Sequence, residues 1–141
     1  MRQAFAAVPI ALSFVLAGCS TELGPSRAEL QAQWDAQNVY PQNYKADLLA
    51  FLRTYLNNPQ GVRGAMVSPP ALTTVGQGQR YVACLRYNAR DIDGKYMGQK
   101  EGAAVYVSAR LDRFADQPHE VKQLCSGAAY AAFPELEALR R

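Results

Sequence analysis

Apolar residues between Lys45 and Leu56 recur every three or four positions, which is typical of one face of a helix. The members of this face are Leu48, Leu49, Phe51, Leu52, Tyr55 and Leu56. Asn43 stands where an N-cap is expected. The run Asn57-Asn58-Pro59 should end the helix, because the residue before a proline disfavours helical backbone. The pattern therefore predicts an amphipathic helix over 45–56.

A second, shorter helix is predicted nearer the N-terminus. Ser26 and Glu29 have the spacing of a capping box, in which two side chains satisfy the first free backbone amides. Leu30 and Trp34 follow four residues apart, so they lie on one face. We expect a helix near Arg27–Gln37, with Trp34 docking it on the rest of the chain.

Strict alternation from Arg80 to Arg90 predicts a strand with one buried face. Tyr81, Ala83, Leu85, Tyr87 and Ala89 share the expected inner face, whereas Arg80, Arg86, Asn88 and Arg90 share the outer one. Two further strands are expected at Val62–Val67 and Ala71–Val75. Asp93-Gly94 is a hairpin signal, and a return strand is expected from Lys95 to about Leu111. Two glycines interrupt that return strand, which leaves its register open.

The C-terminal part contains a predicted short helix at Pro118–Leu124 and an apolar stretch at Ala128–Phe133. Pro134 opens a last short helix, since proline suits a first helical turn. The whole pattern predicts an α+β fold, with N-terminal helices packed on a small antiparallel sheet. We expect one globular domain over residues 44–141.

The first residues have the pattern of an export signal. A basic start (Met1-Arg2-Gln3) is followed by an uncharged run, Ala4–Leu16, that is too short to span a bilayer comfortably. Leu16-Ala17-Gly18-Cys19 closes the segment and matches the lipobox of bacterial lipoproteins. The chain also resembles the small envelope lipoproteins of proteobacteria, a resemblance that implies no particular activity.

The lipobox resemblance implies that lipoprotein signal peptidase recognises Leu16, Ala17 and Gly18, removes residues 1–18 and leaves Cys19 as a lipidated N-terminus. Two or more acyl chains give stable membrane anchoring, because each buried methylene contributes about 0.8 kcal/mol. Residues 19–43 then form a tether that includes the short helix. Ser20, in place of an aspartate, favours the outer membrane, with the domain facing the periplasm.

With Cys19 assigned to lipid, Cys84 and Cys125 remain as a pair in an oxidising compartment. A disulfide between them is favoured over a reactive thiol. It would staple the C-terminal segment to the sheet and contribute about 4 kcal/mol in the chain-entropy model.

Composition and motifs argue against several kinds of function. The net charge of +3 is mild and no run of basic residues is present, so nucleic acid is not an expected partner. A single histidine, His119, excludes a multi-histidine metal site, and we expect neither a metal nor a cofactor. No serine or cysteine elbow or catalytic triad stands out. The chain is therefore expected not to be an enzyme.

The least ordinary feature is a mixture of arginine, lysine and tyrosine in the predicted hairpin. Its members are Arg80, Arg86, Tyr87, Arg90, Lys95 and Tyr96, and both arginine and tyrosine are enriched at protein interfaces. A solvated strand face protected by charge is the plainer interpretation. We expect a non-enzymatic accessory module, anchored to a membrane by its lipid, with an envelope protein or polysaccharide as partner. The alternative is a binding or inhibitor module, for example against a cell-wall-degrading enzyme.

Overall fold

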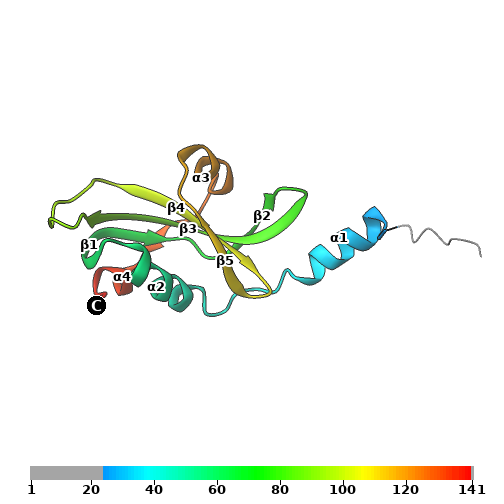
Figure 1. Cartoon of the computed structure of the whole chain (residues 1–141), viewed down its shortest axis with the longest axis horizontal. Coiled ribbons are helices and arrows are strands. Elements are labelled where there is room, and N and C mark those ends of the chain that lie inside the picture. Colours follow the sequence, from blue (N-terminus) through cyan, green and yellow to red (C-terminus); the bar gives the residue numbers. More distant parts are fainter. Residues whose placement is uncertain (1–23, 141) are drawn as a thin grey trace, which may run out of the picture.

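The computed structural model describes residues 24–140, which form one antiparallel sheet with helices on both of its faces (Figure 1). In chain order the elements are α1 (Arg27–Ala36), α2 (Tyr44–Tyr55), β1 (Asn58–Val67), β2 (Ala71–Val75), β3 (Gly78–Arg90), β4 (Lys100–Val107), β5 (Arg110–Ala115), α3 (Pro118–Leu124), β6 (Ala131–Ala132) and α4 (Pro134–Glu137). The predicted signal segment and Cys19 lie outside the described residues. Within the described part, no helix is both long and apolar enough to cross a bilayer.

Strand β3 is the centre of the sheet, whose order is β5-β4-β3-β1-β6 with β2 pairing β3 as well. The first half of β3 pairs with β2 and the second half with β1, while β4 follows its other edge. One long strand therefore carries two shorter partners end to end. Figure 1 shows the result as an elongated molecule with α1 at one end and the β3–β4 turn at the other.

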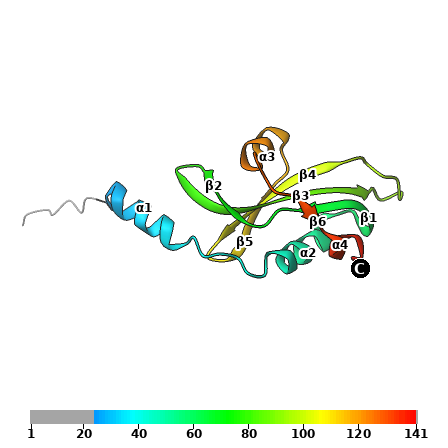
Figure 2. The same ribbon diagram turned by 180° about the vertical axis from the view of Figure 1, so that it is seen from behind.

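Two apolar cores lie on the two faces of the sheet. The larger core joins α2 and α4 to the inward residues of β1, β3 and β4, including Leu48, Leu52, Leu85 and Phe133. The smaller one joins β3 and β4 to α3 and the segment after it. Figure 2, seen from behind, shows α3 on the side opposite α2 and α4. The prediction that only one face of β3 is buried is therefore wrong at its centre, where Val82 and Cys84 are covered by the tail.

The predicted helices are present with small shifts at their ends. In α1, Ser26 accepts from the amide of Glu29 while the Glu29 carboxylate accepts from the Ser26 amide, which confirms the capping box. Asn43 occupies the N-cap of α2 but makes no side-chain cap hydrogen bond. α2 ends at Tyr55, and the stretch around Pro59 belongs to β1.

The predicted return strand, from Lys95 to about Leu111, is wrong: the structure has two strands there. β4 ends at Val107, and β5 begins at Arg110 after a tight turn. Both turn residues, Ser108 and Ala109, have positive φ, 50° and 61°, as the mirror-image hairpin turn requires. Neither is the glycine or asparagine that normally signals such a turn. A tertiary contact supports it, because the Ser108 amide donates to the carbonyl of Gln37 (2.8 Å).

The α+β class and the disulfide are therefore confirmed, and the finer arrangement is corrected. Two of the four helices of the described part, α3 and α4, lie in the C-terminal segment rather than the N-terminal one. The sheet has six strands and is not small. The two-residue connection between β4 and β5 made these two strands look like one in the sequence.

Candidate interaction surface

The predicted arginine and tyrosine residues of the hairpin do not form one surface. Arg80 and Tyr87 are each 5% exposed. Arg86, Arg90 and Tyr96 are half-buried, and Lys95 is exposed. The structure therefore divides the predicted set into an interior part and a surface part.

Arg80 is used inside the molecule, so it is not part of an accessible surface. Its guanidinium lies over the ring of Trp34, 3.6 Å from the centroid. Nη1 donates to the Trp34 carbonyl oxygen (2.7 Å) and to Oδ1 of Asn38 (3.4 Å), and Nη2 donates to Oε1 of Gln37 (2.8 Å). The alternation of the strand placed Arg80 on the outer face, but α1 and the residues after it cover that position.

The contact between Arg80 and Trp34 also holds α1 against the sheet. The indole Nε1 of Trp34 donates to the carbonyl oxygen of Gln79 (2.7 Å). The ring lies so close to Gly78 that a Cβ there would collide with it. We call this group (Trp34, Gln37, Asn38 and Arg80) the Trp34 latch. Because α1 has no buried residue of its own, the latch is its main attachment.

Tyr87 belongs to the opposite face of the sheet from Arg86, where it packs beneath α2 in the larger core. Burial and the nearby carboxylate of Asp116 raise the pKa of Tyr87. Asp116 also accepts a hydrogen bond from the hydroxyl of Tyr55 (2.6 Å). The hydroxyl of Tyr55 has a raised pKa for the same two reasons, burial first. Tyr87 is therefore a core tyrosine, not a surface contact.

The remaining residues gather on the α3 side of the sheet, towards the β3–β4 turn. Cross-strand neighbours share a face, and Arg63 of β1 pairs with Asn88 of β3. Arg63 therefore lies on the same face of the sheet as Arg86 and Arg90, which share that face of β3 with Asn88. Tyr130, between α3 and β6, reaches the same face. We call this set the Arg/Tyr surface; it consists of Arg63, Arg86, Arg90, Tyr96 and Tyr130.

Arg86 is held between a carboxylate and an aromatic ring. Its Nε donates to Oε1 of Glu101 on β4 (2.6 Å), and its guanidinium carbon lies 3.9 Å from the centroid of Tyr130. Burial raises the pKa of the Tyr130 hydroxyl, and the neighbouring cation of Arg86 lowers it in part. Glu101 neutralises Arg86, so this arginine contributes shape more than free charge.

Arg63 and Arg90 share the ring of Tyr96. Their guanidinium carbons lie 4.1 Å and 5.2 Å from its centroid. The hydroxyl of Tyr96 donates to the carbonyl oxygen of Gly61 (2.6 Å), which fixes the ring. Arg90 passes directly over Gly61, where no side chain fits. Its Nε is buried and has no hydrogen-bond partner in residues 24–140.

The β3–β4 loop that carries Tyr96 is well ordered by its own hydrogen bonds. Oδ1 of Asp91 accepts from the amides of Asp93 and Lys95, both at 2.9 Å. The Met97 amide donates to the carbonyl of Ala89, and Arg90 and Tyr96 form an isolated bridge. Ile92, at the tip, is 79% exposed. The loop therefore presents an apolar side chain from a backbone that is already organised.

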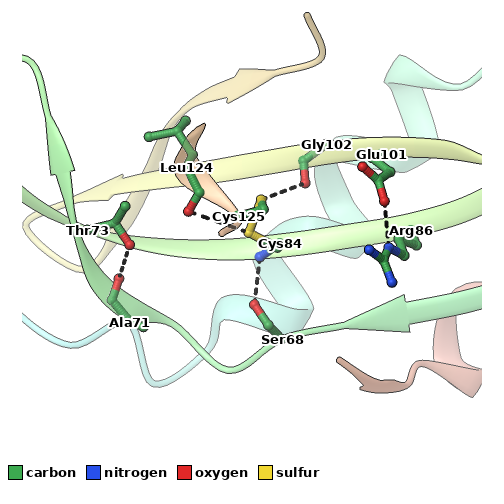
Figure 3. The surroundings of a disulfide bond; sticks show 9 residues. All are labelled: Ser68, Ala71, Thr73, Cys84, Arg86, Glu101, Gly102, Leu124 and Cys125. Atoms are coloured by element: carbon green, nitrogen blue, oxygen red, sulfur yellow. Dashed lines mark hydrogen bonds and ion pairs between the residues drawn. A yellow bond between two sulfur atoms is a disulfide. The ribbon is translucent and has the colours of Figure 1, made fainter. Parts of the chain in front are cut away.

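The disulfide explains why the tail lies beside this surface (Figure 3). Cys84 on β3 and Cys125 after α3 are bonded, with their α-carbons 5.7 Å apart. Ser68 supports the cysteine of the strand, since its Oγ accepts from the Cys84 amide (2.8 Å) and its own amide donates to the Cys84 carbonyl. Neither sulfur is a free thiol, so the predicted pairing is confirmed and the reactive-thiol interpretation is not supported.

Among residues 24–140, no three histidine, cysteine, aspartate or glutamate side chains gather as a metal site would require. No protein-family model, curated protein or solved structure matches the chain. Sequence reasoning missed Arg63 and Tyr130, because only strand pairing and the disulfide bring them to β3. The one signal for Arg63 was its place in a predicted neighbouring strand.

Proposed function

We propose that this chain is a cell-envelope lipoprotein, cut before Cys19, acylated on that cysteine and held on the periplasmic side of the outer membrane. The lipobox Leu16-Ala17-Gly18-Cys19 supports the anchor. Its tethered domain is a non-enzymatic accessory module that binds an envelope partner through the Arg/Tyr surface. The membrane is reached by lipid, and no cofactor is involved.

The observation that carries this proposal is the place of the Arg/Tyr surface in the molecule. The chain leaves the anchor through α1, at one end, whereas the surface lies towards the β3–β4 turn at the other (Figure 1). The Trp34 latch attaches α1 firmly, with three hydrogen bonds from Arg80 and one from Trp34. A domain held in this way presents its arginines and tyrosines away from its own membrane, towards other envelope components.

A second function, an inhibitor or binding module, is favoured by the β3–β4 loop. Its backbone is organised before any partner arrives, so little conformational entropy is lost on binding. Ile92 projects from it as an apolar anchor. As an inhibitor, the domain would insert this loop into the cleft of an enzyme, such as one that degrades the cell wall.

The anchor is tested by replacing the cysteine. Cys19→Ser should give an unprocessed chain that takes up no palmitate, since only a thiol forms the thioether. Fractionation of membranes by density should place the wild-type protein with the outer membrane. Mass spectrometry that finds a processed chain without lipid, or a leader still attached, would contradict the anchor.

The interaction is tested by cross-linking in intact cells. Gln99 is exposed, and its side chain lies close to Gly64, the residue after Arg63. A photoreactive residue at position 99 should therefore capture an envelope component, and Arg90→Gln should reduce the yield. A photoreactive residue at position 92 should capture an enzyme if the chain is an inhibitor. Position 110, exposed at the end near α1, is the matched control. Capture from position 110 with the same yield would contradict a role for the Arg/Tyr surface.

A further inference from the structure

Two arginines of the Arg/Tyr surface share one ring without a carboxylate between them. Arg63 and Arg90 both stack on Tyr96, and the ion pairs formed within residues 24–140 include neither of them. Two cations that contact the same ring repel each other, and an anion placed against both removes the repulsion. The pair is therefore suited to an anionic ligand.

The spacing of the pair follows from the sheet. Arg63 lies opposite Asn88, and Asn88 and Arg90 are alternate residues on one face of β3. The α-carbons of Arg63 and Arg90 are thus offset by two residues along the strand direction, which is about 7 Å. An extended polypeptide with acidic residues at i and i+2 presents its carboxylates on one side with the same spacing. Adjacent acidic residues point to opposite sides instead.

Resting on the function proposed above, we infer that Arg63, Tyr96 and Arg90 bind an extended acidic segment of a protein partner, with carboxylates on alternate residues. Each guanidinium receives one carboxylate, and the tyrosine ring holds both planes in place. Guanidinium groups match carboxylates better than ammonium groups do, because they offer two parallel N–H donors. The lipid to which the chain is attached is not the ligand, since the surface lies at the end away from α1.

Two peptides of equal composition and charge test this inference on the lipidated protein in nanodiscs of neutral lipid. One has the alternating order Ser-Glu-Ser-Glu-Ser and the other has the adjacent order Ser-Ser-Glu-Glu-Ser, both capped at their ends and fluorescently labelled. Fluorescence anisotropy should show that the alternating peptide binds about fivefold more tightly. Arg63→Gln and Arg90→Gln should each weaken it about fivefold, as loss of one charge-assisted contact predicts.

Arg110→Gln is the control, because it removes the same charge from an exposed position near α1. It should leave the affinity unchanged. Arg63→Lys keeps the charge but loses the planar fork, so its affinity should fall between those of wild type and Arg63→Gln. An unchanged melting temperature in each variant shows that the fold is intact.

Three results would overturn the inference: equal binding of the two peptides, equal loss in Arg110→Gln, or competition by polyphosphate or polygalacturonate as effective as by the alternating peptide. The last result would assign the surface to a non-protein polyanion. If the peptides fail while cross-linking from position 99 still depends on Arg90, the proposed function stands and only this inference fails.

Discussion

Strand β3 has an arginine near its start and another at its end, and each contacts an aromatic ring but is used differently. At the start, Arg80 is buried, and its hydrogen bonds go to Trp34, Gln37 and Asn38. At the finish, Arg90 stacks on Tyr96 in a half-buried position with no anionic partner in residues 24–140. An arginine that is buried and hydrogen-bonded within its own chain stabilises a fold, whereas one that makes no such bond is available to a ligand.

The largest expected effect concerns the disulfide, which lies between the two ends. Reduction should lower the free energy of unfolding by about 4 kcal/mol, because the open chain regains the entropy of a long loop. The melting temperature should fall by roughly 10–20 °C. The double variant Cys84→Ala, Cys125→Ala should be insensitive to reductant. A wild-type melting temperature that does not change with reductant would show that the two sulfurs are not bonded.

The next effect separates the two arginines. Arg80→Met should lower the free energy of unfolding by about 2–3 kcal/mol, since the hydrogen bonds that the buried guanidinium donates to three residues are lost. Arg90→Met should lower it by less than about 1 kcal/mol, because its position is half-buried. Urea denaturation of both variants measures the difference. Equal effects would mean that the two ends of β3 are not used differently.

A smaller effect is expected at the glycine beneath Arg90. Gly61 has a φ of +70°, and a Cβ there would collide with the guanidinium. Gly61→Ala should cost about 1–2 kcal/mol and should also weaken binding at the Arg/Tyr surface. Gly94→Ala is matched in backbone, with a φ of +81°, but nothing lies within 4 Å of its Cβ. It should show the strain without the loss of binding.

The smallest effect concerns the start of α1, at the end of the helix away from the Trp34 latch. Hydrogen bonds from Ser26 lower the pKa of Glu29. A carboxylate with a lowered pKa in the fold contributes stability above its unfolded pKa and loses it as the pH falls through the folded value. The Ser26 and Glu29 amide signals in NMR should therefore shift at a pH below 4.5, the ordinary value. Glu29→Gln should abolish that titration while leaving the Trp34 ring signals unchanged.

Periodicity was enough to predict α1, α2, α3 and the alternation of β3, because these depend on neighbours within a few residues. The disulfide was predicted from the two cysteines that remain if Cys19 carries lipid, as proposed above. The β4–β5 turn could not be predicted, because Ser108 and Ala109 adopt positive φ against their own preference and are supported by Gln37, far away in sequence. The candidate site was predicted in part: Arg86, Arg90, Lys95 and Tyr96 lie at or near the surface, whereas Arg80 and Tyr87 are interior.

The local order of residues along this chain determines whether each segment is a helix or a strand. It also determines the face on which each side chain of β3 emerges. Whether an emerging side chain meets solvent depends on which distant segment packs there, and alternation carries no information about that. Arg80 and Arg90 occupy the same face of one strand, yet α1 covers the first while the second keeps its free donors. That difference arises only when segments separated by more than forty residues come together.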